Sequence, residues 1–542
     1  MSAPTLAGPT GSMIIGFDAV TGTGPRQTST DPRTGQALEP GYPAASDEQV
    51  EAAVTLAAAA AAPARATTPQ QRAGFLTAVA DLLDERRDAL VERAHAETAL
   101  PLPRLTGEVG RTSGQLRLFA AELLAGTWQD ACVDPARPDR TPLPRSDIRR
   151  RRVPLGPVVV FGASNFPFAF STAGGDTASA LAAGCPVVVK AHPAHLGTAE
   201  LVATAVRDAA VASGMPEGVF SQLVGTGNET GTALVADSRI RAVGFTGSRA
   251  GGLALAATAA ARPTPIPVYA EMSSINPVLV LPGALAARGA ELGIAFVGSL
   301  TLGAGQFCTN PGLVLAVDGP GLDAFLDAAA TAVGADAGAV MLTPGIARHY
   351  AGAGDAVAAR PGVQELARGA SPDAAAAGRA RLLVVDGERV VDDPALQAEA
   401  FGATSLVVRC TDTEQLFAVL GVLEGQLTAT VHADVEQAGD VELAARLMPV
   451  LEDLAGRILF GGWPTGVEVG HAMVHGGPFP ATTDGRSTSV GTLAVERFLR
   501  PVAYQDVPEA LLPAVLRNDN PEGAWRRVDG ELTRAAIEEG LR

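Results

Sequence analysis

The spacing of apolar residues along the first part of the chain predicts helices. Between Asp47 and Leu100 apolar residues recur at intervals of three and four, which indicates two amphipathic helices. A third helix is expected over Glu108–Ala125. The Pro- and Arg-rich stretch Pro135–Arg152 interrupts this periodicity and is either a linker or an edge ribbon. Met1–Ser12 is small and polar without such spacing, so we expect a loose arm there.

A different pattern begins at Val153, where short apolar runs alternate with helical segments as far as Pro282. Runs such as VVVFGAS and PVVVKAH alternate with helical stretches such as Gly197–Ala212, and this order predicts a doubly wound parallel sheet. Such sheets bind ligands at the carboxyl ends of their strands. A second set of helices and strands follows to about Pro480, and an extended run, RFLRPVAYQ, precedes a polar tail.

The bulk composition narrows the class of protein. With 542 residues, 47% of them hydrophobic, the chain is expected to form two or three packed units. The formal net charge of −17 repels phosphate backbones and anionic lipid, so a small molecule is a better candidate ligand than nucleic acid. The first residues lack a basic segment followed by an apolar run, and Ala57–Ala62 is too short to span a bilayer. Neither export nor membrane insertion is expected.

One cysteine differs in its surroundings from the others. The four cysteines are scattered without CxxC spacing or nearby paired histidines: Cys132, Cys185, Cys308 and Cys410. Neither a disulfide framework nor a zinc site is indicated, and a reducing cytoplasm is expected. Cys308 lies in a turn rich in Gly, Gln and Asn, LGAGQFCTNPG, which suits a reactive thiol, although a cysteine taken alone is more often a small buried hydrophobe. His471 and His475 lie four apart, but the glycines around them argue against a helix, and no metal is assigned.

Several motifs stand in a fixed order along the chain. They are ASNFPF at Ala163–Phe168, FTGS at Phe245–Ser248, AEMSSINP at Ala270–Pro277, GQFC at Gly305–Cys308 and EAFG at Glu399–Gly402. From about Asp31 to Gln505 the chain resembles the aldehyde dehydrogenase superfamily. AEMSSINP, GQFCTNPG and GWPTGVEVGHAMVHGGPFPAT are similar, more narrowly, to the branch that contains 2-oxoglutarate semialdehyde (2,5-dioxopentanoate) dehydrogenases and NADP-dependent fatty aldehyde dehydrogenases.

The resemblance assigns catalytic roles to three residues. Cys308 is the nucleophile, whose thiolate adds to the aldehyde carbon. Asn165 and the Cys308 backbone N–H would stabilise the resulting oxyanion, although an asparagine before Phe-Pro also suits an ordinary turn. Glu271 ends the apolar strand PVYAEM and would activate the hydrolytic water. Burial there is expected to raise its pKa, and a salt-bridged strand end is the alternative.

Two glycine-containing turns are candidates for binding a dinucleotide. GTGNETG, beginning at Gly225, is a near miss of the GxGxxG fingerprint, because Thr230 stands where the third glycine should be. Gly247 and Ser248 open an expected helix whose N–H groups suit phosphate, and Ser248 is the expected contact. Taken alone, FTGS is also an ordinary N-cap turn.

The resemblance adds three further cofactor positions. Lys190, the single lysine of the chain, ends the strand CPVVVK at the family's adenosine-ribose position. Pro193 stands three positions later, where members restricted to NAD commonly bear an acid, so we expect NADP to be accepted, with NAD also possible. Glu399 and Phe401 match the E-x-F-G element that holds the nicotinamide ribose, although a glutamate at such a boundary is often only a solvated charge.

Substrate recognition is predicted from one helix and one loop. An aldehyde with a distal carboxylate needs guanidinium or amide donors, which Arg111, Gln115 and Arg117 offer, although surface arginines on a helix are usually solvated. The resemblance makes Phe168 and Phe170 another wall of the substrate tunnel.

The resemblance also implies an α/β fold in three parts, namely a Rossmann-type cofactor domain, an α/β catalytic domain carrying Cys308, and a small β ribbon for oligomerisation. The expected boundaries are 13–138 and 153–282 for the cofactor domain, 283–485 for the catalytic domain, 139–152 and 486–505 for the ribbon, and 506–542 for a tail. Exposed ribbon edges invite pairing between subunits, so a homodimer or homotetramer is expected.

The expected activity is NAD(P)-dependent oxidation of an aldehyde to a carboxylate through a thiohemiacetal and a thioester, with 2-oxoglutarate semialdehyde as the leading substrate. A medium- or long-chain fatty aldehyde is the second candidate. Transfer of the acyl group to coenzyme A is a further alternative. The presence of Glu271, which could activate water, favours hydrolysis of the thioester instead. A non-catalytic protein with this fold is opposed by the joint presence of Asn165, Glu271 and Cys308.

Overall fold

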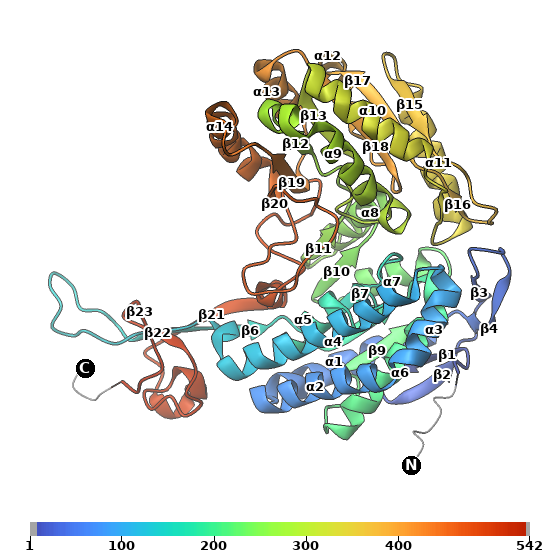
Figure 1. Ribbon diagram of the computed structural model, residues 1–542. Coiled ribbons are helices and arrows are strands. Elements are labelled where there is room, and N and C mark those ends of the chain that lie inside the picture. The colour runs from blue at the N-terminus through green and yellow to red at the C-terminus, as the bar shows by residue number, and fades with distance from the viewer. Residues whose placement is uncertain (1–7, 538–542) are drawn as a thin grey trace.

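The computed structural model describes residues 8–537. Two seven-stranded sheets, each covered by helices, form the body of the molecule, and a smaller sheet projects from it (Figure 1). The first sheet runs β11 (Val268–Glu271), β10 (Ala242–Thr246), β7 (Val158–Phe161), β8 (Val187–Lys190), β9 (Phe220–Leu223), β1 (Ser12–Ile15) and β2 (Asp18–Thr21). Its strands from β11 to β9 are parallel, which confirms the doubly wound sheet, and β1 adds antiparallel to β9.

Helices cover both faces of this sheet: α1 (Asp47–Ala66), α2 (Pro69–Glu85), α3 (Arg87–Thr98), α4 (Leu102–Ala125), α5 (Gly175–Ala183), α6 (Leu196–Ala212), α7 (Glu229–Ala236) and α8 (Arg249–Ala260). The prediction of two helices over Asp47–Leu100 is wrong, because the chain forms three there. Thr68 closes a capping box with Gln71 and thereby starts α2, and Arg86 interrupts the run before α3.

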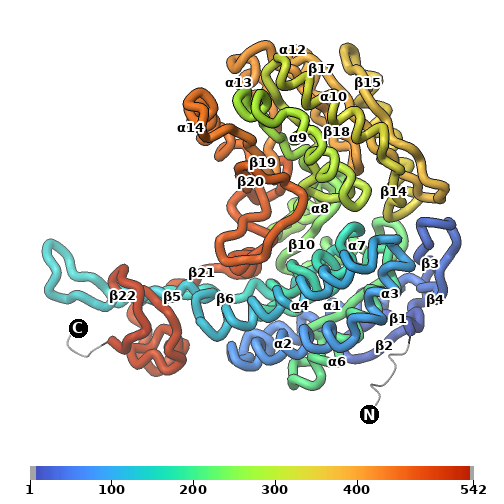
Figure 2. Tube along the Cα trace, viewed as in Figure 1, coloured from blue at the N-terminus to red at the C-terminus, as the bar shows by residue number. Residues whose placement is uncertain are grey.

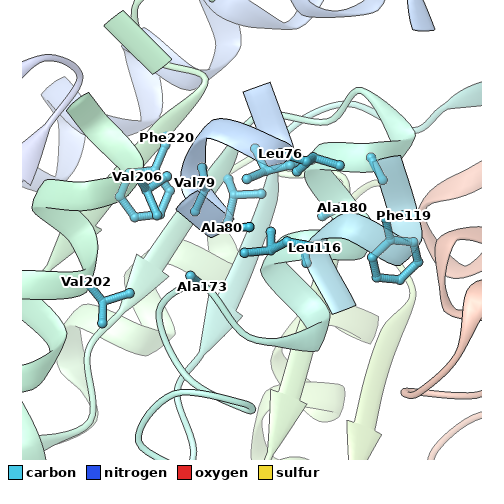
Figure 3. Close-up of a cluster of buried hydrophobic side chains, with 14 of the residues drawn as sticks. Leu76, Val79, Ala80, Leu116, Phe119, Ala173, Ala180, Val202, Val206 and Phe220 are labelled. Carbon is cyan, nitrogen blue, oxygen red and sulfur yellow. The ribbon is translucent and has the colours of Figure 1, made fainter. Parts of the chain in front are cut away.

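The core of this part lies where α2, α4 and α6 pack on the sheet. Figure 3 shows Leu76 and Val79 of α2 beside Leu116 of α4, with Val206 of α6 and Phe220 of β9 nearby. All five side chains are buried. The apolar stripes predicted from the sequence therefore face the sheet, and burial of their area is the main favourable contribution to this packing.

The second sheet lies above the first in Figure 1 and carries the remaining long helices. It runs β15 (Gln364–Arg368), β17 (Arg381–Asp386), β18 (Thr404–Cys410), β13 (Leu313–Val317), β12 (Val278–Val280), β19 (Gln426–His432) and β20 (Ala455–Phe460). Its helices are α9 (Pro282–Thr301), α10 (Pro320–Gly334), α11 (Pro344–Ala358), α12 (Gly387–Asp392), α13 (Thr413–Val422) and α14 (Ala438–Leu454). Two short strand pairs, β3 (Arg26–Thr30) with β4 (Ala37–Pro43) and β14 (Ala339–Val340) with β16 (Ala377–Gly378), complete the body.

Helix α9, with the short turn after it, is the one segment among residues 8–537 that is long and apolar enough to cross a membrane by length and composition. Its buried face, including Leu292 and Phe296, packs against Phe325 of α10 in one cluster, whereas Ile294 is exposed. This one-sided burial is that of a core helix.

The projecting sheet runs β21 (Leu499–Gln505), β6 (Ile148–Pro154), β5 (Ala131–Asp134), β22 (Arg526–Val528) and β23 (Glu531–Thr533). Figure 2 shows how the segments β5, β6 and β22 extend away from the body of the molecule. The extended run RFLRPVAYQ contains β21, as expected, but Thr492–Phe498 forms a 3-10 turn inside the predicted ribbon segment 486–505. The tail from 506 joins the ribbon, because β22 pairs with β5 and Val515 and Leu516 are buried against Val133.

The expected loose arm at the N-terminus is partly wrong. Residues 1–7 lie outside the described part of the chain, but Thr10 and Gly11 donate backbone hydrogen bonds to Glu200 of α6, and Ser12 already belongs to β1. The buried Glu200 carboxylate accepts these bonds and so holds the start of the chain against the helices of the first sheet.

Candidate active site

Three functional side chains from distant segments meet between the two sheets. Cys308 lies in the turn after α9, Glu271 ends β11, and His475 comes from the long connection between β20 and the 3-10 turn Thr492–Phe498. His475 Nε2 lies 3.4 Å from Cys308 Sγ and 2.9 Å from Glu271 Oε1. Both His475 and Glu271 are almost fully buried.

The connection that carries His475 is fixed along the edge of β11. Met272 N donates to Ala481 O at 2.8 Å and Thr483 N donates to Ala270 O at 3.0 Å, so residues near Thr482 run beside Glu271. Ser489 N donates to His475 O at 2.8 Å, which places His475 and Ser489 together over the Glu271 carboxylate.

The turn that presents Cys308 is held by glycine geometry and one asparagine. Gly305 has φ +71, and a Cβ there would lie 2.3 Å from Ala403 N, so no larger residue fits. Asn276 Nδ2 donates to both Cys308 O and Asn310 O at 2.9 Å. The thiol is therefore presented from a backbone that is fixed before substrate arrives.

Glu271 departs from the sequence expectation in its ionisation. Burial raises the pKa of the Glu271 carboxyl, as expected, but its contact with His475 and hydrogen bonds from His475, Ser489 and Cys308 outweigh it and leave the pKa lowered. Ser489 Oγ donates to Glu271 Oε2 at 2.7 Å. The expectation of a raised pKa for Glu271 is therefore wrong, because the sequence could not show these hydrogen-bond partners. The partners hold the carboxylate in its charged form.

The Cys308 thiol has the opposite tendency. Burial raises its pKa well above the usual range, and the nearby negative charge of Glu271 raises it further. The side chain therefore rests as a thiol, and a base must take its proton before it can act as a nucleophile. Two basic groups are in reach: His475 Nε2, 3.4 Å from Sγ, and the Glu271 carboxylate, to which the thiol hydrogen-bonds.

Asn165 reaches the same turn from the loop after β7. Its Nδ2 donates to Gln306 O at 3.0 Å, and its own backbone carbonyl accepts from Arg104 Nη2 at 2.9 Å. An amide carries two N–H groups, so one remains for an oxyanion formed beside Cys308.

His475 and Ser489 are the site residues that sequence reasoning missed. In the sequence His475 stands out only by its four-residue spacing from His471, and the sequence assigns no catalytic role to it. In the structure His471 is exposed and contacts Thr492, whereas His475 is in the centre. The different roles of the two histidines follow from the pairing of residues 481–483 with β11, which brings His475 to Glu271. A single sequence does not show this long-range pairing.

The three central side chains also form a candidate donor set for a metal ion. One atom each from Glu271, Cys308 and His475 lies within 4.8 Å of the others. Sulfur, imidazole nitrogen and carboxylate oxygen are ligands that Zn²⁺ takes in proteins. A metal bound there would occupy the thiol, so it would inhibit rather than assist attack by that thiol.

The expected cofactor residues lie at the ends of strands in the first sheet and beside a cavity. Lys190 ends β8 half-buried, and burial lowers its pKa. Ser248 is the N-cap of α8 and accepts from Gly251 N at 3.2 Å, so the N-cap interpretation holds for its side chain. Gly247 N donates to Glu271 O at 3.0 Å. Gly225 follows β9 and packs against Thr230.

Glu399 and Phe401 line a cavity together with Ser274 and Asn310. Burial raises the pKa of Glu399 to about 8, although a backbone hydrogen bond from Ser274 opposes the shift. A buried carboxyl without a cationic partner beside a cavity fits a residue that receives hydroxyl groups of a ligand.

The expected substrate residues divide into two groups. Phe168 is buried, and the Phe170 ring centroid lies 6.1 Å from that of His475, so Phe170 borders the catalytic centre. The Arg111 guanidinium lies 5.4 Å from the Phe170 centroid. Gln115 is buried beside Gly175, whereas Arg117 points away and pairs with Asp81 and Asp84. Arg117 is therefore not placed to contact a ligand at Cys308.

Comparison with known proteins agrees with this geometry. Residues 20–350 match the aldehyde dehydrogenase family. The chain is 56% identical over 523 residues to alpha-ketoglutaric semialdehyde dehydrogenase 2 of Azospirillum brasilense, covering 96% of this chain and 99% of that relative. It is 48% identical to alpha-ketoglutaric semialdehyde dehydrogenase of Acinetobacter baylyi, over 86% of this chain and 88% of the relative.

The fold is likewise that of a solved structure, aldehyde dehydrogenase C of Pseudomonas syringae, which was determined with NAD+ and octanal. The TM-score is 0.77 at 21% identity, over 92% of this chain and 97% of the other. The chain therefore belongs to the aldehyde dehydrogenase family and is an NAD(P)-dependent oxidoreductase that acts on aldehydes. The α/β fold predicted from the motifs is confirmed.

Proposed function

We propose that the protein oxidises 2-oxoglutarate semialdehyde to 2-oxoglutarate. The observation that carries this proposal is the contact of His475 Nε2 with both Cys308 Sγ, at 3.4 Å, and Glu271 Oε1, at 2.9 Å. It joins a nucleophile to a base and a carboxylate in one buried cluster. The names of the two curated relatives supply the choice of substrate.

The reaction begins with proton transfer from the Cys308 thiol to His475 Nε2, which then donates to the ionised Glu271 carboxylate. The thiolate forms a bond to the aldehyde carbon, and the oxyanion that results accepts hydrogen bonds from Asn165 and the Cys308 backbone N–H. Each such donor contributes about 3 kcal/mol to transition-state stabilisation. A nicotinamide cofactor held near Glu399 and Phe401 would supply the acceptor for the hydride that leaves this carbon, and loss of the hydride leaves a thioester on Cys308.

Hydrolysis of the thioester requires water rather than a second thiol. The Glu271 carboxylate, fixed by Ser489 and His475, accepts a proton from the water as its oxygen bonds to the acyl carbon. Loss of the Cys308 sulfur as leaving group then releases the carboxylate product. Glu271 thus serves the hydrolysis step, while His475 keeps it ionised.

We propose further that NADP is accepted alongside NAD. Lys190 ends its strand next to the cofactor-binding edge, and in the described part of the chain no carboxylate lies within ion-pair distance of it. Pro193 begins the short turn that follows and carries no charge to repel a 2′-phosphate. A kcat/KM with NADP far below that with NAD would contradict the proposal that NADP is accepted.

The ribbon supports a homodimer or homotetramer, because β21 and β23 each pair on one side only among the described strands. A monomeric mass by light scattering at micromolar concentration would contradict it. All four cysteines lie within the described residues and are free, which supports a cytoplasmic location.

The first experiment follows formation of reduced cofactor with 2-oxoglutarate semialdehyde, succinic semialdehyde and decanal. The unaltered protein is compared with Cys308→Ala and with Cys132→Ala, a cysteine of the ribbon strand β5. Only the first substitution should abolish turnover, and 2-oxoglutarate semialdehyde should give the highest kcat/KM. A higher value with decanal would overturn the substrate, and turnover by Cys308→Ala would overturn the mechanism.

A further inference from the structure

Two half-buried guanidinium groups near the catalytic thiol lack a carboxylate partner among the described residues. Arg111 of α4 donates from Nη2 to Val467 O at 3.1 Å. Arg457 of β20 donates from Nη1 to Gly466 O at 2.9 Å and from Nη2 to Pro464 O at 2.8 Å. Within residues 8–537, neither arginine forms an ion pair at 4.0 Å or less, and Arg111 Nη1 and Arg457 Nε are buried without a hydrogen-bond acceptor.

Both arginines hold the same loop, residues 464–467, from two sides. This loop touches the residue next to the nucleophile, because Gly466 N donates to Thr309 Oγ1 at 3.4 Å. The Phe170 ring lies near both Arg111 and His475, with 5.4 Å from guanidinium to ring centroid and 6.1 Å from that centroid to the His475 ring. The two cations therefore flank the approach to Cys308.

Their electrostatic surroundings agree with this placement. Burial lowers the pKa of both guanidinium groups. The interaction with Glu108 is the largest that opposes this change at Arg111, and a thiolate at Cys308 would oppose it at both arginines. Arginine nevertheless stays protonated in proteins, so two positive charges remain in a poorly hydrated region. An uncompensated buried charge is costly, and an anion that binds beside it recovers part of that cost.

The nearest buried acid on the same helix does not neutralise them. Glu108 Oε1 already accepts from Phe168 N at 2.8 Å and from Ala169 N at 3.0 Å, and burial raises the pKa of its carboxyl. Arg117, farther along this helix, differs because Asp81 and Asp84 pair with it at 2.7 and 2.8 Å. Arg104 of this helix also lacks an ion pair among the described residues, but it packs over the rings of Phe166 and Phe307 and donates to Asn165 O. Arg111 and Arg457 are the unpaired cations that share the 464–467 loop.

We propose that Arg111 and Arg457 together form the subsite that binds the carboxylate end of the substrate while its aldehyde carbon meets Cys308. This inference rests on the proposed function and adds to it a residue, Arg457, that no motif indicated. Guanidinium groups bind carboxylates through paired, charge-assisted hydrogen bonds, so the subsite selects acidic aldehydes over neutral ones.

The test compares kcat/KM for 2-oxoglutarate semialdehyde and for pentanal, a neutral aldehyde of the same chain length, in the unaltered protein, Arg111→Gln and Arg457→Gln. The ratio of acidic to neutral aldehyde should fall about tenfold to a hundredfold in each variant, mainly through KM for the acidic aldehyde. Arg457→Lys should recover part of it. Arg117→Gln, on the same helix, is the matched control and should leave the ratio unchanged.

A structural role in holding the 464–467 loop would lower the rates for both aldehydes in parallel, and an unchanged ratio in both Gln variants would overturn the subsite. Titration with glutarate, an unreactive dicarboxylate, separates this result from failure of the proposed function. Binding of glutarate that weakens in Arg111→Gln and Arg457→Gln would support the subsite even if 2-oxoglutarate semialdehyde were not oxidised. Absence of glutarate binding by the unaltered protein, or binding equally strong in all variants, would refute it.

Discussion

Glu271 is buried and Glu399 is half-buried beside a cavity, and the pKa values of the two carboxyl groups are shifted in opposite directions. Glu271 has His475 and Ser489 as partners, and its pKa is lowered. Glu399 has a single backbone donor, and burial raises its pKa to about 8. Burial is common to both, so the partners decide the sign of the shift. The charged group serves proton transfer, and the neutral one faces the cavity.

The largest effect on turnover should follow from removing the negative charge of the Glu271 carboxylate. Glu271→Gln cannot accept a proton from water, so the thioester should persist after one hydride transfer. Steady-state turnover should fall about a hundredfold to ten-thousandfold, whereas a burst of reduced cofactor close to the enzyme concentration should remain. Rapid-mixing absorbance measures both. Steady-state turnover close to that of the unaltered protein would show that a different group activates the water.

The next effect concerns the partner that keeps Glu271 charged. His475→Asn should lower kcat about a hundredfold, because the variant loses both the acceptor of the thiol proton and a hydrogen-bond partner of the Glu271 carboxylate. Without the imidazole, burial dominates and the pKa of Glu271 rises, so the acid limb of the kcat profile should move to higher pH. His471→Asn, in the same connection but exposed, is the matched control. If both variants show the same pH profile, the role assigned to His475 is wrong.

Zinc distinguishes the two carboxylates in another way, because only Glu271 shares a donor cluster with Cys308 and His475 in the described part of the chain. At a Zn²⁺ concentration about ten times its dissociation constant, about nine-tenths of the sites are filled and turnover should fall about tenfold. A chelator should restore it, and Glu399→Gln should remain sensitive. Equal inhibition of His475→Asn would place the metal elsewhere.

The smallest effect should be a change in thermal stability when Glu399 is replaced. Its folded pKa of about 8 exceeds its usual 4.5, so between these values the folded protein keeps a proton that the unfolded chain releases. Stability therefore falls as pH rises through this window. Glu399→Gln does not lose stability in this way, because glutamine does not ionise. The Tm of the variant minus that of the unaltered protein should therefore increase by about one or two degrees from pH 5 to pH 8. A constant Tm difference across this range would show that Glu399 ionises normally.

The parts of the fold that repeat a local pattern could be predicted from the sequence. The alternation of VVVFGAS-type runs with helices gave the parallel sheet, and Glu271 lies at its strand end as expected. Features set by contacts between distant segments could not be predicted. The position of His475 depends on pairing of 481–483 with β11, and the sign of the Glu271 shift depends on Ser489 and His475. Arg457 lies in a strand without any motif, and only its placement beside the 464–467 loop singles it out.

The C-terminal strands have a consequence for how copies of the chain can add to one another. β22 covers the edge of β5 and is followed by β23, which has three residues, so the sheet presents a short edge on that side and the seven-residue β21 on the other. A strand of three residues offers few backbone groups as a template for addition. Growth is then confined to one side, and contact between two identical edges closes on itself through a two-fold axis instead of continuing as an open filament.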